Sequence, residues 1–167
     1  MVLTKSELID ALQTEVKILL HLAEKADKAA LDYRPTAKQR STLELLKYMT
    51  MMGPALVEAA KTGTFDLDGW TAGEQAASAR TAEQTMKALA AQSDWYASAL
   101  GGLSDADFRA EVAPFGDKTT RGAFIVRWVL CGCAAYRTQI FLYLKSCGRD
   151  ELGTSNLWRG VDAAAAV

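Results

Sequence analysis

One stretch of 28 residues constrains the fold more than any other part of the chain: it extends from Thr120 to Cys147 and is followed by Gly148. Apolar or small residues recur along it at three- and four-residue intervals, which is helical and not strand spacing: Ile125, Trp128, Val129, Gly132, Tyr136, Ile140 and Tyr143. Thr119 or Thr120 can cap its start, and Gly148 stands where a left-handed C-terminal cap is expected. Such a helix would be roughly 40 Å long, which is the full height of a small helical bundle.

Three further amphipathic segments are predicted to be helices, at about residues 5–29, 41–60 and 79–100. Each begins with the pattern of a capping box, formed by Thr4 with Glu7, Ser41 with Glu44, and Thr81 with Gln84. Pro54 lies inside the second segment and is expected to kink the helix or end it early. The Gly-, Thr- and Asp-rich residues 61–77 are predicted to be a long connection that Phe65 and Trp70 hold against the bundle. Such a connection is a candidate pocket rim.

Together these patterns predict an all-α protein, a four-helix bundle that forms a single domain over residues 1–167, with residues 120–147 as the fourth helix. Two of the connections are long, so the simple up-down-up-down order is not required. The short C-terminal tail after Gly148 is expected to dock on the bundle through Leu152, Leu157 and Trp158, and residues 163–167 are expected to fray.

Composition limits the classes of function. Hydrophobic residues make up 50% of the chain and charged residues 23%, which indicates a globular protein. The net charge of −1 includes no basic stripe, so nucleic acid is not an expected partner. No signal-peptide pattern and no apolar run of about 20 residues is present, so we expect a cytoplasmic protein without a membrane span. The low net charge does little to keep copies apart and favours a homodimer.

Several segments, in order, resemble the DinB-like superfamily. Residues 136–140, Tyr-Arg-Thr-Gln-Ile, are similar to the His-Arg-Gly-Gln-Ile segment that ends the family's metal motif. Residues 33–35 with 40–48, and the loop 112–120, are similar to the passages that precede it. The resemblance covers roughly residues 5–147 and implies a four-helix bundle, often a dimer, in which many members bind a divalent metal through three histidines.

The metal ligands do not carry over to this chain. The family's three histidine positions fall on Tyr48, Gly132 and Tyr136. A phenol is a poor ligand near neutral pH and glycine offers no side chain, so neither a metal nor another cofactor is expected. Cys133 is a good zinc ligand by chemistry, but it would stand alone, and its expected role is that of a small buried hydrophobe. The only histidine, His21, falls on the exposed face of the first helix.

The altered metal site is therefore predicted to be an aromatic-lined pocket for a small organic ligand, with seven candidate residues: Tyr48, Met52, Trp128, Gly132, Cys133, Tyr136 and Arg137. Arg137 and Gln139 are expected to satisfy the phenols, and Glu44 to hold Arg137. No nucleophile–base pair is visible, so no catalytic residue is assigned. The preferred hypothesis is a small-molecule-binding or regulatory bundle; the alternatives are a thiol-dependent transferase, as the resemblance implies, and a purely structural dimeric bundle.

Overall fold

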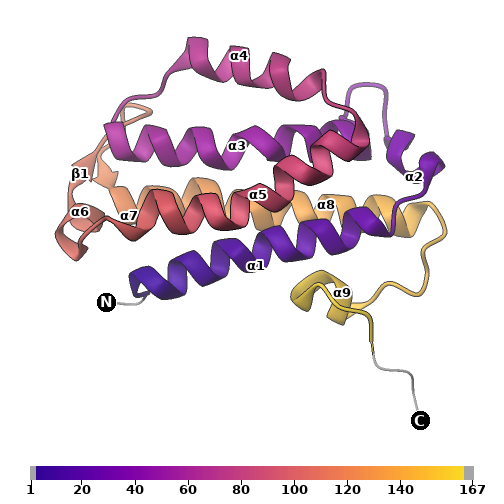
Figure 1. The fold of residues 1–167 in the computed structure, drawn as a ribbon. Helices are drawn as coiled ribbons and strands as arrows, with labels where there is room; N and C mark the ends of the chain where they lie inside the picture. Colours follow the sequence, from indigo (N-terminus) through magenta and orange to yellow (C-terminus); the bar gives the residue numbers. More distant parts are fainter. Residues whose placement is uncertain (1–2, 164–167) are drawn as a thin grey trace.

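The computed structural model describes residues 3–163. Its long helices are α1 (Lys5–Glu24), α3 (Thr42–Thr62), α5 (Ala82–Gly101) and a continuous fourth helix made of α7 (Arg121–Phe124), η1 (Ile125–Leu130) and α8 (Cys131–Ser146). These four form the predicted all-α bundle (Figure 1). The buried apolar side chains of all four lie in one core. Shorter elements are α2 (Lys28–Asp32), α4 (Leu67–Ser78), α6 (Asp105–Arg109), α9 (Thr154–Arg159) and the strands β1 (Glu111–Val112) and β2 (Thr119–Thr120).

The helix starts follow the sequence closely. Capping boxes begin α1, α3 and α5 as predicted, each with the first residue's side chain accepting from the backbone of the third helical residue. Gly148 follows the fourth helix with a φ of 84°, in the left-handed region where glycine has no Cβ penalty. The first helix is shorter than expected, because it ends at Glu24 and Asp27 caps the separate α2.

The four long helices do not alternate in direction. Figure 1 shows that α3 and α5 run the same way and that α4 returns the chain between them along the outer side of α3. Lys5, at the start of α1, donates hydrogen bonds to the carbonyl oxygens of Gly101 and Leu103 at 2.7 and 2.9 Å, so α1 lies antiparallel to α5. Helix α4 is therefore the crossover that this order needs.

One prediction for the middle of the chain was wrong, and of the two alternatives for Pro54 the structure excludes the early end of the helix. Residues 67–78, predicted to be part of a connection, form helix α4, whose start Asp66 caps by accepting from the backbone of Gly69. Its weak helix formers are offset by packing on α3, since Phe65 and Trp70 rest on the bundle core. Pro54 does not end α3, which continues to Thr62 and stops at Gly63, with a φ of 77°.

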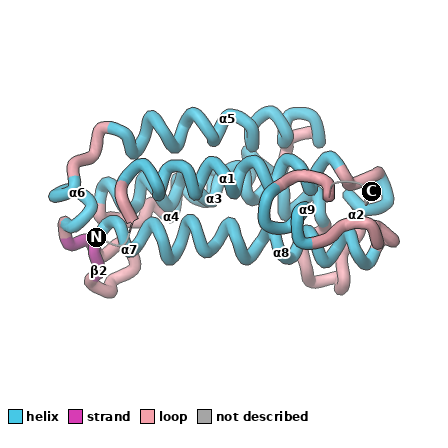
Figure 2. Tube along the Cα trace, turned by 90° about the horizontal axis from the view of Figure 1, so that it is seen from below, coloured by secondary structure: helices cyan, strands magenta, loops and turns pink. Residues whose placement is uncertain are grey.

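The C-terminal segment lies across α1 and α8 (Figure 2). Leu152 is buried at 3% exposure, as predicted, and Leu157 is half-buried. Trp158 is 61% exposed, and the Arg137 guanidinium lies 4.9 Å from its ring centroid. The predicted fraying of residues 163–167 falls, from residue 164 on, outside the described residues. No helix in the described part of the chain is long and apolar enough to cross a membrane.

Candidate functional site

A cavity of about 410 Å³ opens between α3, α4, the β1–β2 loop and the fourth helix. Five of the seven predicted pocket residues line it: Tyr48, Met52, Trp128, Gly132 and Tyr136. The structure does not bring the other two, Cys133 and Arg137, into this cavity. It adds Phe65 and Trp70, which belong to the predicted pocket rim, and five residues that no motif indicated: Leu56, Phe115, Arg127, Cys131 and Ala135.

Aromatic rings surround the cavity in an unbroken series, which we call the aromatic wall: Tyr136, Tyr48, Trp70, Phe65, Phe115 and Trp128. Successive ring centroids are 5.4, 6.0, 5.4, 5.1 and 5.1 Å apart; three of the five pairs meet edge to face, as aromatic pairs prefer, and two are tilted. The series starts and ends on the fourth helix, with Gly132 midway between Tyr136 and Trp128. The backbone of the fourth helix spans the remaining gap in the aromatic wall between Trp128 and Tyr136, and the Met52 side chain faces Gly132 there.

The fourth helix supplies two stripes of lining residues, Arg127, Cys131 and Ala135, and Trp128, Gly132 and Tyr136. Both have four-residue spacing, which drifts by about 40° per step around a regular α-helix. Residues 125–130 are π-helical, and the backbone N–H of Cys131 bonds to the carbonyl of Val126, five residues back. This wider turn corrects part of the drift, so both stripes reach one cavity. Such π-helical turns are frequent at functional sites.

Tyr48 divides this cavity from a second hollow between α3 and α4. One face of its ring is covered by the Arg40 guanidinium, 4.1 Å from the centroid, and Arg40 is held by Glu74 at 2.7 Å. Burial, and next the Tyr136 phenol, raises the pKa of Tyr48 well above its ordinary value. Tyr48 is therefore a neutral phenol across the physiological range and offers no anionic oxygen.

Cys133 and Arg137 belong to the core on the other side of the fourth helix. Cys133 is 3% exposed, and burial, with the Glu15 carboxylate second, raises the pKa of its thiol to about 12. Arg137 pairs with Glu15 on α1, where Nε and Oε2 lie 3.2 Å apart without the alignment of a hydrogen bond. It also donates to the carbonyl oxygen of Leu157 at 3.0 Å.

The predicted partners of Arg137 and the phenols were thus wrong. Glu44 caps α3 and pairs with Arg34 at 3.0 Å, and the amide of Gln139 donates to the Tyr143 hydroxyl instead. The carboxylate that pairs with Arg137 belongs to Glu15 on α1 and not to Glu44. Glu15 lies three residues after Leu12 and four before Leu19, which is a position on the apolar stripe of α1, and this spacing was the sequence signal for its burial.

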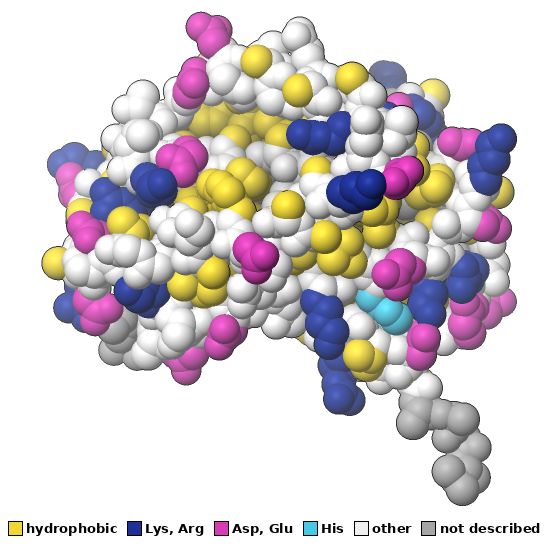
Figure 3. Space-filling view, viewed as in Figure 1, with side chains coloured by type: hydrophobic (Ala, Val, Ile, Leu, Met, Phe, Trp, Pro, Cys, Tyr) yellow, Lys and Arg dark blue, Asp and Glu magenta, His cyan; other side chains and the backbone are white. Residues whose placement is uncertain are grey.

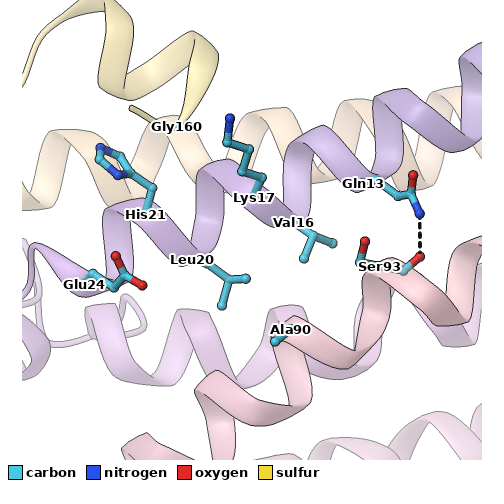
Figure 4. Close-up of a pocket in the computed structure, with 9 residues that line it drawn as sticks. All are labelled: Gln13, Val16, Lys17, Leu20, His21, Glu24, Ala90, Ser93 and Gly160. Atoms are coloured by element: carbon cyan, nitrogen blue, oxygen red, sulfur yellow. Dashed lines mark hydrogen bonds between the residues drawn. The ribbon is translucent and has the colours of Figure 1, made fainter. Parts of the chain in front are cut away.

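His21 was predicted to be exposed, but its side chain is only 12% exposed because the C-terminal segment covers it. Its Nε2 lies 3.0 Å from the Asn156 amide nitrogen. Figure 4 shows it at a hollow of about 300 Å³ between α1, α5 and Gly160, where Gln13 donates to the Ser93 carbonyl oxygen at 3.0 Å. Lys17, His21 and Glu24 there point in different directions and do not converge on one point, so this hollow is the weaker candidate site.

We compared the chain with known proteins. No family model and no curated protein matches it. A solved structure does: a DinB-like protein of Bacillus subtilis, YjoA, superposes with a TM-score of 0.68 over 88% of this chain and 95% of that one, at 18% sequence identity. The fold is that of a DinB-like protein. At this identity, the superposition establishes the DinB-like architecture and no function.

The donor set of this chain does not suit the metal that many DinB-like proteins hold. The three positions that the sequence resemblance assigns to histidine are Tyr48 and Tyr136, whose ring centroids are 5.4 Å apart, and Gly132. A Cβ at Gly132 would lie 3.4 Å from Met52 Cε, so the glycine faces a thioether. Within residues 3–163, no three or more His, Cys, Asp or Glu side chains gather into a group that could hold a metal ion.

The three cysteines, all free, should differ sharply in reactivity. Cys131 is exposed and lines the cavity, whereas Cys133 is buried with a pKa raised to about 12. We expect iodoacetamide at pH 8 to alkylate Cys131 readily and to leave Cys133 unmodified, because the Cys133 thiol is shielded from the reagent and its burial disfavours the reactive thiolate. Half-buried Cys147 should react at an intermediate rate.

Peptide mass spectrometry over a time course measures the three rates. The same reaction in denaturant is the control, in which all three cysteines should react alike. Native Cys133 reacting as fast as Cys131 would contradict the placement of Cys133 in the core.

Proposed function

We propose that this protein is a metal-independent DinB-like bundle that binds a small organic molecule in the cavity inside the aromatic wall. The observation that supports this most directly is the continuous series of six aromatic rings along about 410 Å³ of space at the place where the resemblance puts a metal. Ligand cavities in proteins have this range of volume, with mainly aromatic and aliphatic walls and a few polar groups.

The polar groups of the cavity support binding more than catalysis. They are two phenols, the Cys131 thiol, the indole N–H groups and the Arg127 guanidinium. None of the lining residues is a histidine, aspartate, glutamate or lysine that could act as general base for the thiol. A transferase therefore lacks its proton acceptor in this cavity. The homodimer stays a prediction.

A neutral aromatic probe tests the proposal. N-phenyl-1-naphthylamine fluoresces more strongly in apolar surroundings, and we expect it to bind the wild-type protein saturably at one site per chain. Gly132→Phe should weaken this binding at least about tenfold, because the new ring occupies the floor of the cavity. Ala135→Trp fills the same cavity from an exposed position. It is the second cavity-filling variant, and it tests the proposal even if Gly132→Phe disturbs the helix.

Fluorescence titration measures the affinity, with circular dichroism to verify that each variant is folded. Adding EDTA or zinc should leave the affinity unchanged, because no group in the proposed mode of binding is a metal ligand. Absence of saturable binding, binding that survives both cavity-filling variants, or binding that requires a divalent metal would each contradict the proposed function.

A further inference from the structure

The cavity is lined by one positively charged side chain, Arg127, to which the proposed function assigns no role. Of its twelve lining residues, Arg127 alone carries a charge at neutral pH. The ion pairs and side-chain hydrogen bonds found among residues 3–163 do not involve its guanidinium. Other arginines of the bundle are engaged: Arg34, Arg40, Arg121, Arg137 and Arg149 each contact a carboxylate.

The contact that Arg127 does make keeps it at the cavity. Its guanidinium lies 5.1 Å from the ring centroid of Trp128, at the end of the aromatic wall. Stacking on an indole leaves the edge of a guanidinium, with its N–H donors, free to bind an anion. The π-helical turn carries both residues, so the backbone feature that orients Trp128 also places the charge.

No acidic side chain lines the cavity, so a cationic ligand would meet a positive charge and no compensating carboxylate. This argues against the cation-binding aromatic cage that six rings would otherwise suggest. An anion with an apolar body fits both observations. Its charge would meet Arg127 in a charge-assisted hydrogen bond, and its rings would lie against the aromatic wall.

We propose that the ligand is an aromatic organic acid, with its carboxylate or equivalent anionic group held by Arg127 and its ring system enclosed by the aromatic wall. The proposal rests on the proposed function and specifies the class of ligand. In this proposal Arg127 determines the specificity for an anion, and Trp128 positions the Arg127 guanidinium by stacking against it. The chemistry needs one anionic group at the cavity mouth and a planar apolar part of about one to three rings.

Two probes that differ in one anionic group distinguish the proposal of an anionic ligand from the broader proposal that the cavity binds a small organic molecule. 8-Anilinonaphthalene-1-sulfonate has the ring system of N-phenyl-1-naphthylamine plus a sulfonate, which stands in for the carboxylate. We expect the wild-type protein to bind the anionic probe about tenfold more tightly than the neutral one, since a charge-assisted hydrogen bond contributes roughly this factor. Raising the salt concentration from about 0.05 to 0.5 M should weaken only the anionic probe, because its contact with the exposed guanidinium is screened.

Variants at Arg127 supply the decisive comparison. Arg127→Gln should lower the affinity for the anionic probe to that for the neutral probe and leave the neutral probe unaffected, whereas Arg127→Lys should retain part of the preference. Lys38→Gln removes the same charge from an exposed position outside the cavity and should change neither affinity. Both probes should protect Cys131 from iodoacetamide, which locates them in the cavity.

The outcomes are distinct. Equal affinities of the two probes, or an equal loss of both in Arg127→Gln, would overturn the assignment of an anionic ligand while the proposed function stands. Binding of the anionic probe without protection of Cys131 would place it elsewhere and would also overturn the assignment. Failure of both probes to bind would contradict the proposed function itself.

Discussion

Replacing either member of the buried Glu15–Arg137 pair should lower the free energy of unfolding by about 3–5 kcal/mol, while replacing both should cost less than either single change. The two side chains are 7% and 5% exposed, and their nearest charged atoms lie 3.2 Å apart. Glu15→Leu leaves a guanidinium in the core without its counter-charge, and Arg137→Met does the same to the carboxylate. In the double variant the core contains neither charge, and apolar side chains of similar size occupy the space.

The two single variants should respond differently to pH. Burial raises the pKa of Glu15 above its ordinary 4.5, and the Arg137 charge opposes this rise, so Arg137→Met raises the pKa further. The folded state then binds the proton more tightly than the unfolded state. This contribution to stability is complete below the unfolded pKa and is lost as the pH rises through the folded pKa. Arg137→Met should therefore recover stability when the pH is lowered from 7 to 5, whereas Glu15→Leu should not, because arginine does not titrate in this range.

Urea unfolding, followed by circular dichroism at both pH values, measures these differences. The exposed pair of Lys87 and Glu83, 2.8 Å apart, is the matched control, and removing it should have no measurable effect. Arg137 also holds the C-terminal segment through Leu157 and Trp158, so its loss should expose α9 to proteolysis, and the loss of Glu15 should do so less. A double variant less stable than both single variants would show that the ion pair itself stabilises the bundle.

The second large effect is expected at Gly53, in the middle of α3. A Cβ there would lie 1.9 Å from the Tyr96 hydroxyl oxygen and 3.2 Å from Cζ, and the Tyr96 side chain is completely buried. Gly53→Ala should therefore destabilise the protein by about 1–3 kcal/mol or more, although alanine is the better helix former. Tyr96→Phe alone should be close to neutral, because the hydroxyl is buried without an aligned hydrogen-bond partner.

The double variant Gly53→Ala with Tyr96→Phe should regain most of the loss, because the clashing oxygen is absent. A thermodynamic cycle of the four proteins, from thermal or urea unfolding, should give a coupling energy above about 1 kcal/mol. Gly101→Ala, where a Cβ meets nothing within 4 Å, is the control and should be neutral or mildly stabilising. Additive effects at Gly53 and Tyr96 would show that the two residues do not press on one another.

The sequence predicts the framework of this fold well, because the framework follows from local chemistry. Three capping boxes and the glycine after Cys147 set helix ends through contacts within a few residues, and all of them are present. Helix α4 was missed because two glycines and a threonine interrupt its better helix formers, and contacts distant in sequence help to hold it: Ala77 is buried, Trp70 packs on the core, and Glu74 pairs with Arg40. Propensity is a weak guide where tertiary contacts decide.

The candidate site was predictable only in part. Tyr48, Gly132 and Tyr136 could be brought together because helical spacing and the family resemblance place them on facing helices. Phe115 and Arg127 could not, since one comes from a loop and the other depends on the π-helical turn. One signal for that turn exists in hindsight. The buried residues Ile125, Val129, Cys133 and Arg137 keep four-residue spacing, and over these steps a regular helix would rotate its buried face by about 120°.

Because of this π-helical turn, the fourth helix contains one residue more than a regular α-helix would use to join α7 to α8. A deletion of one residue between Ile125 and Leu130 could be absorbed by a return to regular α-helix, with α7 and α8 still in place against the core. What would change is the direction of Arg127 and Trp128, which would no longer share one side of the helix with Gly132 and Tyr136. The mouth of the cavity can therefore be redesigned by changing the length of the chain at a single point, independently of the residues that hold the four helices together.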